Sequence, residues 1–127
     1  MLNNIQKITT FTQLIVWQKA HQLVLRVYQL TGTFPKNEQF GITDQMRRCA
    51  VSITSNIAEG FSRQGNKEKT QFYYISRGSL TELQNQLLVA RDIHYIKRTD
   101  FDNIAEQTVE VHKILNGLIK SQKLEYR

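Results

Sequence analysis

The side chains best suited to catalysis or metal binding are three histidines and one cysteine. His21, His94 and His112 fall in three different predicted helices, and none has a carboxylate partner at helical spacing. Glu110 and His112 are two residues apart, which points them to different faces of a helix. Cys49 lies at the edge of an apolar stripe without an obvious base, so we interpret it as a small hydrophobe. The sequence therefore predicts no catalytic residue, no metal site and no cofactor.

Residues 60–67 superficially resemble a phosphate-binding loop, with the sequence GFSRQGNK. An asparagine precedes the lysine, and Glu68 stands where a Ser or Thr would hold magnesium. The segment also follows a predicted helix, whereas such loops follow a strand. We therefore reject a nucleotide-hydrolysing site at this position.

A polar strip along residues 43–63 is more informative, because its members share one helix face. They are Arg48, Ser52, Ser55, Asn56, Glu59 and Arg63. The strip has two interpretations: a binding surface in which Arg contacts phosphate, or a structural network containing an i,i+4 Glu–Arg pair. We favour the structural role for Asn56 and Glu59, and both roles stay open for the two arginines.

The net charge of +6 is unevenly distributed along the chain. Residues 1–98 hold 13 Lys and Arg against 6 Asp and Glu, whereas residues 99–127 hold 4 against 5. Such an excess is typical either of a solvated surface or of a protein with a polyanionic partner such as nucleic acid. The candidate nucleic-acid-binding residues are Arg47, Arg48, Arg63, Lys67, Lys69 and Arg77. The aromatic signature of β-sheet RNA readers is absent from the sequence.

Helical periodicity predicts four helices, near residues 12–31, 43–63, 66–94 and 99–121. Thr12, Thr43 and Thr99 are expected to cap or open three of them, and one helical turn is expected after Pro35. Long helices with short connections pack as antiparallel neighbours, so we predict an all-α, up-down four-helix bundle as one domain over residues 1–127. Twelve side chains are predicted to be buried: Leu14, Trp17, Val24, Met46, Ile53, Ile57, Phe72, Leu83, Leu87, Ile104, Val111 and Leu115.

Two of these helices carry more apolar surface than a monomeric bundle needs. Val51 and Ala58 widen the stripe of the second helix, and Tyr74, Leu88 and Val89 form a second patch on the third. Gly78 lies in this patch, and with Ser76 and Ser79 it is expected to let a neighbouring helix approach closely. A second stripe indicates burial against another subunit, the alternative being scattered surface residues. These residues form the predicted oligomer interface.

The cellular setting is inferred mainly from missing signals. The first residues lack the apolar region of a signal peptide, and no apolar run is long enough to span a membrane. A single cysteine excludes an internal disulfide and fits a reducing compartment. We therefore expect a cytoplasmic protein without membrane partners.

Several motifs together resemble the 23S rRNA intervening-sequence protein family, over about residues 11–96. They are FTQL at 11–14, VWQKA at 16–20, QMRR at 45–48, SITSNIAEGF at 52–61 and GSLTEL at 78–83. The resemblance implies a bacterial protein, an antiparallel four-helix bundle and a cyclic homopentamer linked to RNA. Some similar proteins serve as accessory subunits of reverse transcriptases. The sequence departs from the family pattern at Thr54, where Pro is usual, and at Gln84, where Glu is common.

The expected function is a non-enzymatic, oligomeric module that binds RNA or another nucleic acid. The alternative is a protein-interaction scaffold or accessory subunit, for example of a reverse transcriptase. Salt-dependent binding separates the first from the second, because phosphate contacts release counterions.

Overall fold

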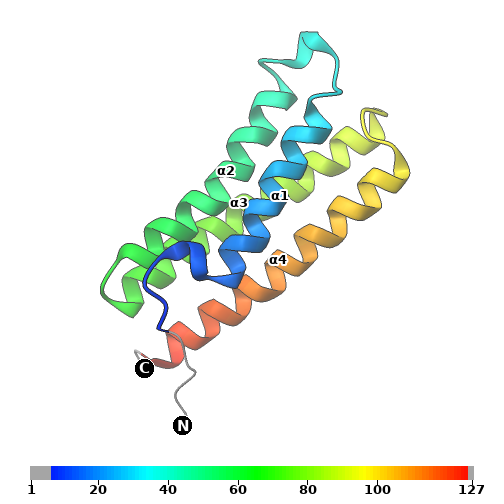
Figure 1. Cartoon of the computed structure of the whole chain (residues 1–127). Helices are drawn as coiled ribbons and strands as arrows, with labels where there is room; N and C mark the ends of the chain where they lie inside the picture. The colour runs from blue at the N-terminus through cyan, green and yellow to red at the C-terminus, as the bar shows by residue number, and fades with distance from the viewer. Residues whose placement is uncertain (1–6, 126–127) are drawn as a thin grey trace.

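Four antiparallel helices make up the fold in the computed structural model, which describes residues 7–125. They are α1 (Ile15–Thr31), α2 (Ile42–Ser62), α3 (Asn66–Asp92) and α4 (Arg98–Glu125). Two single-turn 3-10 helices, η1 (Phe11–Gln13) and η2 (Lys36–Glu38), precede α1 and α2. Successive helices run in opposite directions, and α1 packs against both α2 and α4 (Figure 1). The residues that the structure describes contain no strand, so the predicted all-α four-helix bundle is confirmed.

The first helix begins later than predicted. The chain forms η1 around Thr12 and is extended at Leu14, so α1 starts at Ile15. The side chain of Gln13 stabilises the start of the separate turn, since its Oε1 accepts hydrogen bonds from the backbone N–H groups of Thr9 (2.7 Å) and Thr10 (3.2 Å). A capped turn satisfies its own donors and does not need to continue as an α-helix.

The other predicted ends shift by smaller amounts. Gly41 precedes α2, so Thr43 lies inside the helix and is buried instead of capping it. Thr99 is likewise the second residue of α4, which runs to Glu125. The third helix ends at Asp92 because His94 adopts a left-handed conformation (φ 66°). The N–H of Tyr95 then reaches back to the carbonyl of Ala90 (2.9 Å), which closes the helix end.

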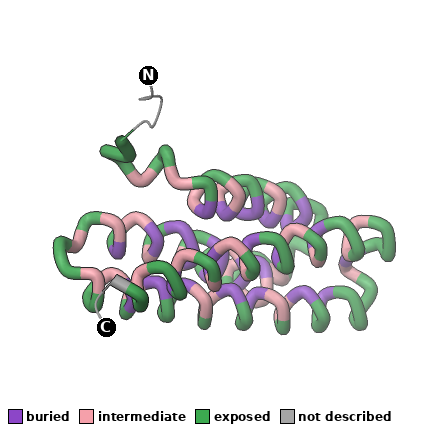
Figure 2. The backbone as a smooth tube through the Cα atoms, turned by 90° about the horizontal axis from the view of Figure 1, so that it is seen from below, coloured by how far each residue is buried: buried purple, intermediate pink, exposed green. Residues whose placement is uncertain are grey.

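The core lies along the bundle axis, where buried residues of all four helices face inward (Figure 2). Most of the residues predicted to be buried are buried, but Leu14, Trp17 and Phe72 are only half-buried. Trp17 lies in the first turn of α1 and stacks on His21, with ring centroids 4.7 Å apart. Tyr73, with 1% of its surface exposed, takes the core position that the periodicity assigned to Phe72.

Small residues set the spacing between α2 and α3. The Ser76 hydroxyl is fully buried and donates to the carbonyl of Ile53 (2.8 Å), and the Cys49 thiol donates to the carbonyl of Ser79 (2.9 Å). Two members of the predicted small-residue set therefore face the neighbouring helix. The third member, Gly78, does not face a helix of the same chain, because it is exposed and a Cβ there would meet no atom within 4 Å.

The connector between α1 and α2 packs against the turn between α3 and α4. The predicted helical turn after Pro35 is present as η2. Phe34 is buried against Tyr95, and the Tyr95 hydroxyl donates to Glu38 Oε2 (2.8 Å). These two turns therefore share one end of the bundle, and the α2–α3 turn lies at the other end (Figure 1).

Candidate nucleic-acid interface

The six candidate nucleic-acid-binding residues do not form one patch. Arg47 and Arg48 lie in the first turns of α2, whereas Arg63, Lys67 and Lys69 surround the α2–α3 turn at the opposite end of the bundle. Arg77 follows on α3, between these two groups. A ligand contacting all six would have to run along most of the bundle, so each group is best considered by its own contacts.

The first group is engaged in contacts within the chain. Arg47 donates from Nε to the hydroxyl of Thr31 (2.9 Å), and its guanidinium lies 4.6 Å from the ring centroid of Tyr28. Arg48 pairs with Asp44 one helical turn earlier, at 2.9 Å. Arg47 thus joins α2 to α1, and a carboxylate lies beside Arg48. A phosphate approaching this pair would meet that negative charge.

Two of the three cations at the α2–α3 turn, Arg63 and Lys69, make contacts within the chain. Arg63 pairs with Glu59 (3.0 Å) and lies 4.8 Å from the ring centroid of Phe72. Lys69 donates from Nζ to the carbonyl of Phe61 (2.6 Å), and partial burial lowers its pKa. Lys67 is exposed and has no side-chain partner among the described residues. Of the three, Lys67 is the cation most available to a ligand.

The third group includes two lysines that the sequence reasoning did not select. Arg77 donates to Asn116 Oδ1 (2.9 Å) and lies 4.9 Å from the ring centroid of Tyr74. The Lys123 ammonium approaches the same ring at 5.7 Å, and Lys120 lines the same groove between α3 and α4. The groove has a volume of about 580 Å³. Aromatic and cationic side chains therefore converge at one site.

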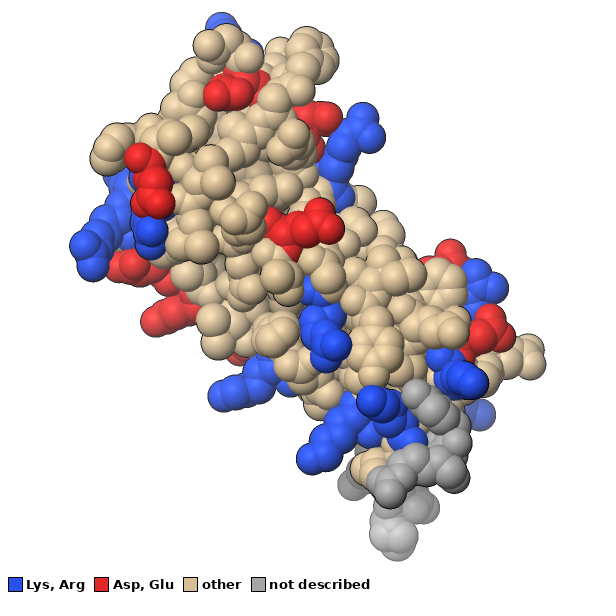
Figure 3. All heavy atoms as spheres, turned by 180° about the vertical axis from the view of Figure 1, so that it is seen from behind, with Lys and Arg blue, Asp and Glu red and all other residues tan. Residues whose placement is uncertain are grey.

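Charge is segregated along the bundle axis. We define the basic half as residues 56–78 and 111–124, on both sides of the α2–α3 turn, and the acidic half as residues 42–55, 79–92 and 98–110. The basic half holds seven Lys or Arg against two Asp or Glu, and the acidic half holds four against seven. Lys and Arg side chains gather on the lower part of the face shown in Figure 3. Arg26, Lys36, Lys97 and Glu38 lie at the acidic end outside these ranges and bring that end close to neutral. A polyanion is therefore attracted mainly to the basic half.

The polar strip of α2 makes contacts both within the helix and across to α3. Asn56 donates to the backbone carbonyl of Ser52 (2.8 Å) and to its hydroxyl (3.1 Å). That hydroxyl is also 2.8 Å from the hydroxyl of Ser79 on α3. Glu59 pairs with Arg63 at the end of the same helix. Asn56 thus belongs to a hydrogen-bond network between α2 and α3, and Glu59 belongs to a separate ion pair next to the α2–α3 turn.

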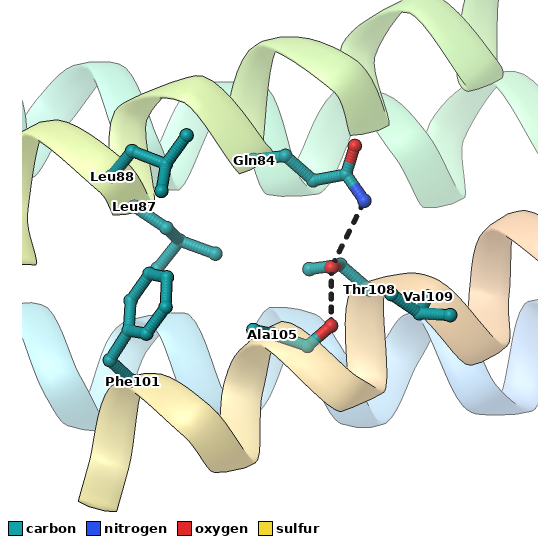
Figure 4. A pocket seen from close by; sticks show the side chains of 7 residues that line it. All are labelled: Gln84, Leu87, Leu88, Phe101, Ala105, Thr108 and Val109. Carbon is teal, nitrogen blue, oxygen red and sulfur yellow. Dashed lines mark hydrogen bonds between the residues drawn. The ribbon is translucent and has the colours of Figure 1, made fainter. Parts of the chain in front are cut away.

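The predicted interface residues lie on more than one face. Val51 borders a groove beside Tyr28, and Ala58 is half-buried on the same helix. Leu88 borders a different groove, between α3 and α4, together with Phe101 and Val109 (Figure 4). The remaining members of the set, Tyr74 and Val89, are exposed on α3.

The groove at Leu88 is the most apolar of these surfaces. Leu88 is 41% exposed and Val109 is 59% exposed. Two polar side chains of the described residues line it, and Gln84 donates to Thr108 (3.1 Å), while Thr108 donates to the carbonyl of Ala105 (2.7 Å) (Figure 4). Its polar groups are thus satisfied internally, which leaves an apolar surface open to solvent.

The cysteine and histidines are placed without catalytic partners among residues 7–125. Burial, together with the negative charge of Glu82, raises the pKa of the Cys49 thiol to about 11. A thiol with such a pKa is protonated at neutral pH and is a weak nucleophile. The described part of the chain holds no group of three His, Cys, Asp or Glu residues placed to bind a metal ion. None of its helices is long and apolar enough to cross a membrane.

The fold and surface define a small helical bundle with one basic half. A model of the 23S rRNA-intervening sequence protein family matches residues 12–117, so the chain belongs to this family. The fold is also similar to that of a protein of unknown function from the S23 ribosomal protein family of Bacteroides thetaiotaomicron. That match has a TM-score of 0.78 at 23% identity and covers 84% of this chain and 96% of the other. A comparison with curated proteins gave no match.

Proposed function

We propose that the protein is a self-associating, non-enzymatic module that binds RNA through its basic half. The observation that carries the proposal is the charge segregation along α2, α3 and α4. Their basic half holds seven basic residues against two acidic ones, and their acidic half holds four against seven. A surface with mixed charges would serve solubility equally well on either half. Separation of the charges instead favours a polyanion bound in one place.

RNA is the favoured polyanion for two reasons. The family to which the chain belongs is described by its relation to intervening sequences of 23S rRNA. In addition, the basic half combines cations with an exposed aromatic ring at Tyr74, a pairing that suits nucleic acid better than an acidic protein.

Self-association is supported by the apolar surfaces that the bundle leaves uncovered. The groove containing Leu88 and Val109 has a volume of about 290 Å³ and is open to solvent. Burying such side chains against a second copy removes apolar area from water, worth roughly 25 cal/mol per Å². We propose a cyclic assembly, as the family resemblance implies. Rotation about an axis keeps the basic half of every copy at the same height, which would let one RNA contact several copies.

The test is RNA binding by fluorescence anisotropy across a salt series. Lys67 and Lys120 are exposed lysines of the basic half, and Lys36 and Lys97 are exposed lysines at the opposite end of the bundle. The Lys67→Ala/Lys120→Ala variant should lower the slope of log affinity against log salt by about 0.7 per lost phosphate contact on single strands. The matched Lys36→Ala/Lys97→Ala variant loses the same charge and should keep the slope of the wild type.

Equal slopes for the two double variants would contradict the proposed site. No binding by the wild-type protein at low salt would contradict RNA binding altogether. That second result, with a partner retained in pull-downs after nuclease treatment, would favour the protein-interaction scaffold or an accessory subunit, for example of a reverse transcriptase. Lys69 is avoided in these variants because its bond to the carbonyl of Phe61 makes it part of the turn.

A further inference from the structure

The groove around Tyr74 has the composition of a site for one nucleotide. Its walls include the apolar side chains of Ile119 and Leu124, and its cations are Arg77, Lys120 and Lys123. Its volume of about 580 Å³ lies within the range of small-ligand sites, roughly 300–1,000 Å³. We infer that this groove binds an unpaired nucleotide of RNA, with the base on Tyr74 and the phosphate at the lysines. The inference rests on the proposed function and gives its substrate class as single-stranded RNA.

The contacts of Tyr74 support this division of roles. Arg77 is fixed by its hydrogen bond to Asn116, so its guanidinium stays beside the ring and can extend the stacking surface. The Lys123 ammonium is 5.7 Å from the ring centroid, near the limit of a cation–π contact. A nucleotide phosphate would be attracted to the ammonium groups of Lys120 and Lys123, which line the groove beside the ring.

Stacking on Tyr74 requires a base whose face is free. In a duplex the base faces are covered by neighbouring pairs, whereas an unpaired base can turn out and stack on an aromatic side chain. The site therefore distinguishes single-stranded from double-stranded RNA, which the lysines alone would not do. Among the residues whose side chains the structure describes, neither Asp nor Glu lines the groove, so a phosphate meets none of their negative charges there.

A second tyrosine of the chain provides a natural control. Tyr28 is 43% exposed against 36% for Tyr74, lies under Arg47 at 4.6 Å, and borders a groove of similar volume, about 610 Å³. That groove also contains Asp44, which pairs with Arg48. The two tyrosines have the same kind of exposure and cation contact, but the side chains lining the Tyr28 groove have a net charge of +1 and those lining the Tyr74 groove a net charge of +3. Tyr74 is therefore the one expected to bind a nucleotide.

The experiment compares Tyr74→Ala, Tyr74→Phe and Tyr28→Ala with the wild type. Binding of a labelled single-stranded RNA and of a duplex of the same length is measured by fluorescence anisotropy. Tyr74→Ala should weaken binding of the single strand by about 5- to 150-fold, the range for losing one base–aromatic stack. It should leave duplex binding and the salt slope unchanged, because no charge is removed. Tyr74→Phe and Tyr28→Ala should bind like the wild type.

Several outcomes would overturn the inference. If Tyr74→Ala binds the single strand normally while the lysine variant of the basic half has a reduced slope, the nucleotide site is wrong and the proposed function stands. If Tyr74→Ala sediments with a lower mass than the wild type, Tyr74 belongs to a subunit interface. If free adenosine monophosphate binds as tightly as the oligonucleotide, the groove is a site for a free nucleotide and RNA is not its ligand. Absence of all RNA binding would remove both proposals.

Discussion

Two glycines within helices, Gly60 in the last turn of α2 and Gly78 near the centre of α3, should respond to the same substitution in opposite ways. Gly60 is buried, and a Cβ at this position would lie 2.7 Å from Cε1 of Tyr73 and 3.0 Å from Cβ of Phe72. Tyr73 is 1% exposed and surrounded by core, so its ring cannot move aside without disturbing the packing of α2 on α3. Gly78 is exposed, and a Cβ there would meet no atom within 4 Å.

The expected magnitudes follow from two opposing effects. Replacing Gly by Ala inside a helix stabilises it by about 1 kcal/mol. Overpacking a well-filled core costs about 1–3 kcal/mol, and the three close contacts at Gly60 place it in the upper part of that range. Gly60→Ala should therefore lose about 1–2 kcal/mol of unfolding free energy, and Gly78→Ala should gain about 1 kcal/mol. The two variants should differ by roughly 2–3 kcal/mol.

Urea unfolding followed by far-UV circular dichroism measures both variants, at one fixed protein concentration because self-association would shift apparent stability. Gly117→Ala serves as a second exposed control, since a Cβ there also meets no atom within 4 Å. A Gly60→Ala variant as stable as the wild type would refute the packing argument. Loss of stability in both exposed variants would show that the propensity argument fails in this bundle.

Two further predictions concern pH and assembly. Burial raises the pKa of Cys49 from 9.0 to about 11 and that of Tyr73 from 10.0 to about 12. Both groups lose protons more easily in the unfolded chain. Their contribution to the free energy of unfolding should therefore be fully present below pH 9 and fall as the pH rises towards 12. Urea unfolding at several alkaline pH values checks this, and Cys49→Ser should flatten the curve between pH 9 and 11. Leu88→Glu should weaken assembly by burying an unpaired charge, whereas the exposed Asn103→Glu should not. Sedimentation measures both, and a wild-type monomer at micromolar concentration would contradict self-association.

The helices were predictable because their signals are local. Apolar periodicity placed four helices in order, and Gly32 and Pro35 correctly marked the end of the first. The ends that shifted depend on contacts that periodicity does not contain. The Gln13 side chain caps the start of η1, the extended backbone at Leu14 separates η1 from α1, and the left-handed backbone at His94 ends α3 early.

Apolar periodicity did not predict which of two adjacent aromatic residues of α3 is buried. Phe72 and Tyr73 are adjacent aromatic residues, so a rotation of the helix by one residue decides which of them enters the core. The tight approach of Gly60 on α2 selects Tyr73, and Phe72 then lies beside Arg63. The contact between α2 and α3 at Gly60 therefore decides which aromatic residue is buried, and the sequence pattern of α3 alone does not.

Lys120 and Lys123 were missed because charge was summed over a region. Residues 99–127 have a net charge of −1, which hides an acidic first half of α4 and a basic second half. Only the antiparallel packing places that basic stretch beside the start of α3, as the bond between Arg77 and Asn116 shows. A sliding charge count along α4 would have found this basic stretch. Its position next to the basic residues of α3 can be known only from the fold.

Antiparallel packing also explains why one short chain can hold both a basic half and an acidic half. Each helix crosses the full bundle, so a helix whose charge changes sign midway contributes to both ends. In α4, acidic residues occupy the half beside the end of α3, and Lys113, Lys120 and Lys123 occupy the half beside its start. The apolar groove at Leu88 lies on the acidic side of this division, whereas the Tyr74 groove lies on the basic side. The two grooves lie at different positions along α3 and α4. Self-association through the Leu88 groove would therefore leave the Tyr74 groove open to RNA.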